Sequence, residues 1–140
     1  MEHIAYCETQ AKELERLLSG EKTMLIRGAA GRKLPHGRVK EGEIVYLIPN
    51  DSSGRILAKA VVASVIDSEK LTQEASVSLI DQHMDKLKLN DRQKERWYGK
   101  RFLCLIDLTN VAEIEPFSYR RERNMDDWIT VERIEDVIEY

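Results

Sequence analysis

Apolar side chains near the start of the chain recur at the spacing of an amphipathic helix. Ala11, Leu14, Leu17 and Leu18 share one side, and charged residues fill most of the positions between them, as expected on a helix with about 3.6 residues per turn. Gly20 follows, and glycine favours the left-handed conformation that ends many helices. The pattern therefore predicts an amphipathic helix that ends at Gly20.

Three later segments are rich in apolar and β-branched residues and are bounded by turn residues, which is typical of strands. They are residues 23–27, 43–48 and 55–66. The second of these is almost continuously apolar, so we expect it to be buried on both faces. It is joined to the third by about six turn residues, Pro49 to Gly54, which predicts a hairpin and hence an antiparallel sheet.

The second half of the chain begins with a helical spacing and returns to strands. After Thr72 the apolar residues that share one helical face are Ala75, Leu79, Ile80, Met84 and Leu87. Asn90 with Gln93 resembles the capped start of a further short helix. A strand is predicted over 101–108, continuing into 111–114, while the tail after residue 128 fits a strand followed by a short helix.

The element order lacks the alternation of strand and helix that marks a parallel sheet. It predicts an α+β protein, a compact small β-barrel with helical insertions. A length of 140 residues without a repeat or a linker allows a single domain, 1–140.

Composition narrows the class of protein further. The sequence has 22 Lys+Arg and 25 Asp+Glu, a net charge of −3, which excludes a globally basic nucleic-acid binder. The longest apolar-rich run, 60–66, is far shorter than the roughly 20 residues that cross a bilayer, and residues 1–3 do not begin a secretory signal. We expect a cytoplasmic protein that does not contact the membrane. Cys7 and Cys104 stand alone and are predicted to be buried thiols without a disulfide.

Positive charge is concentrated in one segment that contains glycines. Residues 26–40 carry no acidic side chain, and their cationic residues and histidine are Arg27, Arg32, Lys33, His36, Arg38 and Lys40. Guanidinium groups and free backbone N–H groups in such a loop can bind phosphate oxygens. The alternative is a solvated loop that contributes only to solubility.

The segment Gly20-Glu21-Lys22-Thr23-Met24-Leu25-Ile26-Arg27 resembles the G-x-K-x-x-x-x-R signature of ASCH domains, a branch of the PUA-like superfamily. Segments 39–47 and 54–66 also resemble the strands that follow this motif in the family. The resemblance implies a β-barrel with a cleft beside the motif and an RNA-related role. It assigns Lys22 and Arg27 to an anionic group or a base edge in that cleft. The alternative for both cations is an ion pair with Glu21, Glu41 or Glu43.

One branch of the family hydrolyses N4-acylated cytidines with a lysine, a threonine three residues later and a distant glutamate. The lysine corresponds to Lys22, but Leu25 stands at the threonine position and has no hydroxyl to attack an amide. Thr23 and Glu74 are weak substitutes, because along a strand Thr23 points away from the face that carries Lys22. The main hypothesis is therefore an RNA- or nucleotide-binding module rather than an enzyme, and the alternative is a small amidohydrolase that acts on a modified nucleoside.

Two further patches extend the candidate site. Trp97 and Tyr98 precede two cations, a pattern that suits stacking on single-stranded bases, although such rings also pack short helices onto a core. Arg120, Arg121 and Arg123 form a second basic segment. The neighbouring Asp126 and Asp127 are expected to cap a helix or to pair with these arginines.

No set of residues has the spacing of a metal site, and no cofactor is expected. The last 30 residues hold nine acidic and four basic residues. A protein partner that contacts this acidic tail is a third hypothesis, and the sequence leaves the oligomeric state open.

Overall fold

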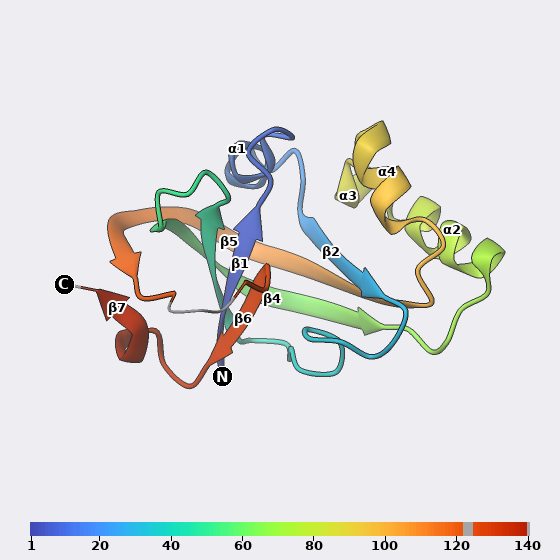
Figure 1. Cartoon of the computed structure of the whole chain (residues 1–140). Coiled ribbons are helices and arrows are strands. Elements are labelled where there is room, and N and C mark those ends of the chain that lie inside the picture. The colour runs from blue at the N-terminus through green and yellow to red at the C-terminus, as the bar shows by residue number, and fades with distance from the viewer. Residues whose placement is uncertain (122–124, 140) are drawn as a thin grey trace.

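A computed structural model describes residues 1–121 and 125–139. The helices are α1 (Glu13–Ser19), α2 (Gln73–Gln82), α3 (Met84–Leu87), α4 (Asp91–Trp97) and the 3-10 helix η1 (Ile134–Val137). The strands are β1 (Glu2–Cys7), β2 (Met24–Ala29), β3 (Ile44–Pro49), β4 (Arg55–Asp67), β5 (Phe102–Tyr119), β6 (Trp128–Val131) and β7 (Ile138–Glu139) (Figure 1).

The strands form one mixed sheet in the order β2-β5-β4-β3-β1-β6, and β7 pairs with β5. The β3–β4 hairpin is antiparallel, as predicted. The pair β1–β3 is parallel, which the sequence analysis missed because it did not recognise β1 as a strand. The α+β class and the helical insertions are confirmed.

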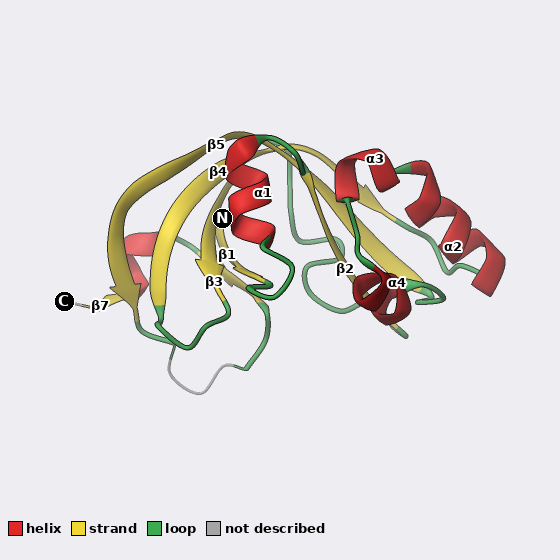
Figure 2. Ribbon diagram, turned by 90° about the horizontal axis from the view of Figure 1, so that it is seen from above, coloured by secondary structure: helices red, strands yellow, loops and turns green. Residues whose placement is uncertain are grey.

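The sheet curls because its two longest strands change register. The ladder between β4 and β5 shifts at three places between Ile56 and Ser64, and such bulges bend a strand and increase its twist. The result is a half-barrel. Figure 2 shows that α1 lies by itself beside the central strands, whereas α2, α3 and α4 form a group beside β2.

Alternating side chains of the same strand enter different hydrophobic clusters, because successive residues point to opposite faces. In β3, Val45 and Leu47 pack in one cluster with the apolar face of α1, while Tyr46 and Ile48 pack in another with β6. The predicted burial of this strand on both faces is confirmed. A third cluster joins β2 to helices α2, α3 and α4.

Local signals in the sequence identified several ends of helices correctly. Gly20 ends α1 with φ of 83°, and Asn90 with Gln93 forms a capping box at the start of α4. Thr23, predicted to lie in a strand, instead precedes β2. The two cysteines are buried free thiols. Within the described residues, we find no helix with the length and apolar character needed to span a membrane.

Candidate functional site

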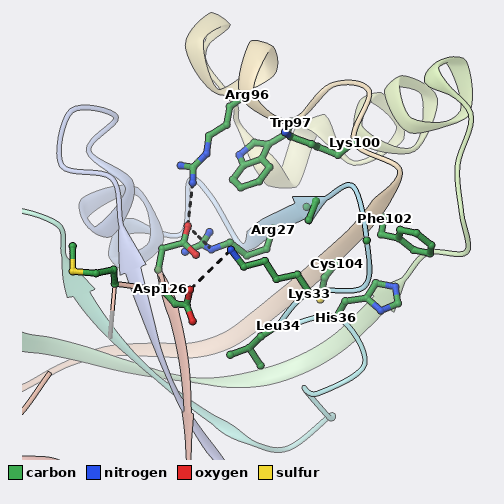
Figure 3. A pocket seen from close by; sticks show the side chains of 15 residues that line it. Arg27, Lys33, Leu34, His36, Arg96, Trp97, Lys100, Phe102, Cys104 and Asp126 are labelled. Carbon is green, nitrogen blue, oxygen red and sulfur yellow. Dashed lines mark hydrogen bonds and ion pairs between the residues drawn. The ribbon is translucent and has the colours of Figure 1, made fainter. Parts of the chain in front are cut away.

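A polar cavity of about 340 Å³ opens where β2 ends. Figure 3 shows Arg96 and Trp97 reaching it from α4, and Lys33, Leu34 and His36 from the loop on the other side. We call it the Arg27 cavity. Its lining residues are Arg27, Gly28, Ala29, Gly31, Lys33, Leu34, His36, Arg96, Trp97, Lys100, Phe102, Cys104, Met125, Asp126 and Asp127.

Arg27 is the most deeply buried charged residue of this cavity, with only 8% of its surface exposed. Its two terminal nitrogens donate hydrogen bonds to the carbonyl oxygens of Ile26 at 2.9 Å and Tyr6 at 2.8 Å. The Nε atom lies 3.4 Å from Asp127 Oδ2 but has no hydrogen-bond partner among the described residues. A buried guanidinium with an unsatisfied N–H group costs free energy unless a ligand or water completes it.

The carboxylate of Asp127 lies between two guanidinium groups. Its Oδ2 atom is 3.1 Å from a terminal nitrogen of Arg96 and 3.4 Å from Arg27 Nε. Arg96 also pairs with Glu8 at 3.0 Å and lies over the ring of Trp97 at 4.3 Å. Two arginines that converge on one oxyanion form an arrangement that suits a carboxylate or a phosphate.

Only part of the predicted basic loop faces the Arg27 cavity. Lys33 lines it and lies 4.0 Å from Asp126. His36 lines it as well and donates from Nε2 to the carbonyl oxygen of Ser68 at 2.8 Å. The other predicted cations of the loop are exposed and do not line the cavity: Arg32, Arg38 and Lys40.

Comparison with known proteins finds similarity at the level of the fold. No family model matches the sequence, and no curated protein matches it. Among solved structures, a mutant form of the ASCH protein from Zymomonas mobilis superposes with a TM-score of 0.64 over 84% of this chain and 75% of that chain. Another ASCH structure from the same organism gives 0.62 over 82% and 71%.

The chain has an ASCH-like fold. The sequence identity to both structures is 14%, so the likeness concerns the fold alone. It confirms the ASCH-like, barrel-type fold that the resemblance implied.

The two motif cations of this ASCH-like fold do not share a cleft, which corrects the prediction for Lys22. Its side chain is 2% exposed and pairs with Glu13 at 3.3 Å, and its ammonium also donates to the carbonyl oxygen of Leu87. Burial lowers the pKa of Lys22, against the opposing effect of Glu13. The partner is none of the three glutamates suggested by the sequence, because α1 folds back and places Glu13 over the ammonium group.

The residues considered for hydrolysis are not assembled. Leu25 is fully buried in the core. Thr23 bonds through its backbone to Lys86 and Leu108. Glu74 is exposed in the first turn of α2, whereas Lys22 is buried between Glu13 and the carbonyl oxygen of Leu87.

The predicted aromatic patch separates into two environments. Trp97 is 4% exposed and lines the Arg27 cavity with one ring face under Arg96. Tyr98 does not line that cavity and donates its hydroxyl proton to Asp81. Of the two rings, only that of Trp97 lines the Arg27 cavity, and Trp97 is largely a core residue.

The predicted basic extension is only partly described. Arg120 donates to the carbonyl oxygen of Asp136, and Arg121 donates to that of Asp126. Arg121 also lies over the ring of Tyr6 at 4.3 Å. Arg123 lies outside the described residues.

The sequence pattern singled out neither Gly28 nor Arg96 as a contributor to the cavity. It indicated Lys100 only as a cation beside Trp97 and Tyr98, and it predicted a helix cap or the arginines of the second basic segment as the partner of Asp127, which instead pairs with Arg27 and Arg96. A Cβ atom on Gly28 would lie 2.8 Å from Leu103 and 3.2 Å from the backbone of Phe102, so this glycine permits close approach to β5. The adjacency of Arg96 to Trp97 was a usable signal, whereas the contact of Asp127 with Arg27 spans 100 positions and has no local signature. Among the described residues, no three His, Cys, Asp or Glu side chains are arranged to hold a metal ion.

Proposed function

We propose that the protein binds single-stranded RNA or a nucleotide-like ligand in the Arg27 cavity, with the basic loop as a flanking phosphate contact. The observation that carries the proposal is the buried guanidinium of Arg27, which has an unsatisfied N–H group behind an open polar cavity. In water-poor surroundings such a group binds an oxyanion or a base edge more strongly than an exposed lysine does.

The charge of the cavity supports an anionic ligand. Its lining includes four cations, Arg27, Lys33, Arg96 and Lys100, against two carboxylates, Asp126 and Asp127. This local excess contrasts with the net charge of −3 of the whole chain. Phosphate contacts made by arginine and lysine supply most of the affinity of nucleic-acid binding and make it sensitive to salt.

The cavity also has apolar surfaces beside its cations. The rings of Phe102 and Trp97 line it, and Arg32 lies over Phe102 at 5.5 Å. Aromatic rings and guanidinium planes are the surfaces on which unpaired bases stack. The volume of about 340 Å³ is at the lower end of the range for small-ligand pockets, which suits one nucleotide. The resemblance of the motif to ASCH domains points to the same ligand class.

The test is a fluorescence-anisotropy titration of short single-stranded and hairpin RNAs at two salt concentrations. The wild type is compared with the variant Arg32→Ala/Lys33→Ala/Arg38→Ala and with a control that removes cations elsewhere, Lys12→Ala/Arg55→Ala/Lys59→Ala. We expect salt-sensitive binding that the loop variant weakens and the control retains. Absence of binding by the wild type at low salt contradicts the proposal.

No observation favours the amidohydrolase alternative over binding, because Lys22, Thr23 and Glu74 are not brought together. The hypothesis of a protein partner for the acidic tail is likewise without a specific contact to support it. Much of that tail is docked on the sheet through β6 and β7.

A further inference from the structure

A second cavity of about 520 Å³ adjoins the Arg27 cavity and shares three lining residues with it, Arg27, Arg96 and Asp127. We call it the Tyr119 cavity. Its further lining residues include Tyr6, Tyr119 and Arg121. The side chains of Asp127, Arg27 and Arg96 therefore stand between two hollows of ligand size.

The Tyr119 cavity offers groups that suit a nucleoside. The guanidinium of Arg121 covers the ring of Tyr6, which gives a flat cationic surface of the kind on which bases stack. The hydroxyls of Tyr6 and Tyr119 are hydrogen-bonded to each other. That bond uses one of their two protons, so the second proton remains for an acceptor on a ligand. Burial raises the pKa of Tyr119, which keeps this donor protonated.

The boundary between the cavities resembles an occupied phosphate site. Arg27 and Arg96 contact the same carboxylate oxygen, Asp127 Oδ2, at 3.4 and 3.1 Å. A phosphodiester has two free oxygens and one negative charge, as a carboxylate has. A phosphodiester in that place would keep one negative charge between the two arginines while the half-exposed Asp127 side chain turns to solvent. An oxygen nearer to Arg27 Nε than Asp127 Oδ2 would complete the unsatisfied N–H group.

We propose that the site takes two consecutive nucleotides of single-stranded RNA, one in each cavity, with the connecting phosphodiester in the place of the Asp127 carboxylate between Arg27 and Arg96. This inference rests on the proposed function, because it assumes an RNA ligand in the Arg27 cavity. Beyond that function, it specifies that the protein recognises two nucleotides and that the Asp127 carboxylate competes with the phosphate for the two arginines.

The test compares, for each of the four bases, a nucleoside monophosphate with the dinucleotide joined by one phosphodiester, as competitors of a labelled RNA. For the preferred base we expect the dinucleotide to bind about tenfold more tightly, since both ligands carry a phosphate but only the dinucleotide fills the second cavity. Asp127→Asn should tighten dinucleotide binding about fivefold, because the amide competes less well for two arginines. Asp85→Asn, on the exposed surface of α3, is the matched control and should change nothing.

Arg121→Ala tests the Tyr119 cavity, with Arg133→Ala as a control that removes an exposed arginine of the same tail. We expect Arg121→Ala to abolish the advantage of the dinucleotide while monophosphate binding persists. Equal affinities for the two ligands, or an Asp127→Asn variant that binds the dinucleotide no better, would overturn this inference and leave the proposed function standing. If the labelled RNA itself does not bind, the proposed function fails first. Thermal unfolding of each variant checks that the fold is retained.

Discussion

Lys22 and Arg27 lie at opposite ends of the same sequence motif, and the protein buries both of them in different ways. Lys22 is enclosed by Glu13 and the carbonyl oxygen of Leu87. Arg27 donates to the carbonyl oxygens of Tyr6 and Ile26 and lies 3.4 Å from Asp127, and it also lines two cavities. Two cations of one motif thus differ: Lys22 is sealed inside the protein, whereas Arg27 lines open cavities.

This difference arises from what covers each end of β2. Alternation along the strand places Leu25 and Arg27 on the face of the main hydrophobic cluster. At the Lys22 end, α1 and α3 cover the strand and supply Glu13 and the carbonyl oxygen of Leu87 as partners of the ammonium group. At the Arg27 end no helix fills the space between α4 and the 28–37 loop, and a polar cavity remains. The two ends of the strand thus differ in whether the buried charge meets packed side chains or a polar cavity.

The largest expected effect is on stability, from Lys22→Ala. Removal of the ammonium leaves the buried carboxylate of Glu13 without its partner, which costs about 3 to 5 kcal/mol of unfolding free energy. Urea unfolding measures the loss. The double variant Lys22→Met/Glu13→Leu should recover most of it, because no buried charge remains. A Lys22→Ala protein as stable as the wild type would contradict the structural role.

The next effect is on RNA binding, from Arg27→Gln. Loss of the guanidinium should weaken binding about 100-fold, or about 2.7 kcal/mol, because a buried charge-assisted contact disappears. Arg27→Lys keeps the charge but lacks the planar fork, so it should recover only part of the affinity. Anisotropy titrations report both values. Unchanged affinity in a folded Arg27→Gln protein would show that the ligand lies elsewhere.

A smaller effect distinguishes cations inside one loop. Lys33 lines the Arg27 cavity and Arg38 does not, although both are exposed. Lys33→Ala should weaken RNA binding about threefold and lower the salt slope by about 0.7, the value for one phosphate contact on a single strand. Arg38→Ala is the matched control, with a smaller change expected. Equal losses in the two variants would favour a diffuse electrostatic contact over a cavity.

The smallest expected effect is the pH dependence of stability contributed by His3, a buried residue that lines neither cavity. Trp128 donates to its Nδ1, so Nε2 carries the proton and donates to Glu43 at 2.9 Å. Burial lowers the pKa of His3 despite Glu43. The pKa of His3 is therefore lower in the folded protein than its ordinary value of 6.5, which applies to the unfolded chain. As the pH decreases below 6.5, the unfolded chain binds a proton before the folded protein does, so the free energy of unfolding decreases.

Unfolding free energies of the wild type and His3→Gln between pH 7 and pH 5 measure this dependence. The variant should show a flatter profile over that interval. Parallel profiles in the two proteins would contradict the neutral state of His3.

The features of the fold that depend on residues close together in the sequence could be predicted. Helix ends at Gly20 and Asn90 follow from local conformational preference, and the burial of β3 follows from its continuous apolar run. β1 could not be recognised, because its six residues include Glu2 and His3, and its parallel pairing with β3 joins segments about 40 positions apart.

The candidate site could be predicted only in part for the same reason. The basic loop and Arg27 are visible as a local excess of charge. The ion pair of Lys22 with Glu13 depends on how α1 packs against the start of β2. The contact of Arg27 with Asp127 depends on the pairing of β6 with β1. Such long-range contacts decide which cation remains available, and no spacing in the sequence encodes them.

The most direct test of the central claim follows the side-chain N–H signals of Arg27 and Lys22 by NMR while RNA is added. The account predicts that the Arg27 Nε–H resonance, assigned by its loss in Arg27→Lys, shifts and saturates with the RNA. The ammonium signal of Lys22 should remain unchanged. Saturable RNA binding that leaves the Arg27 resonance in place, or that moves the Lys22 signal instead, would contradict it.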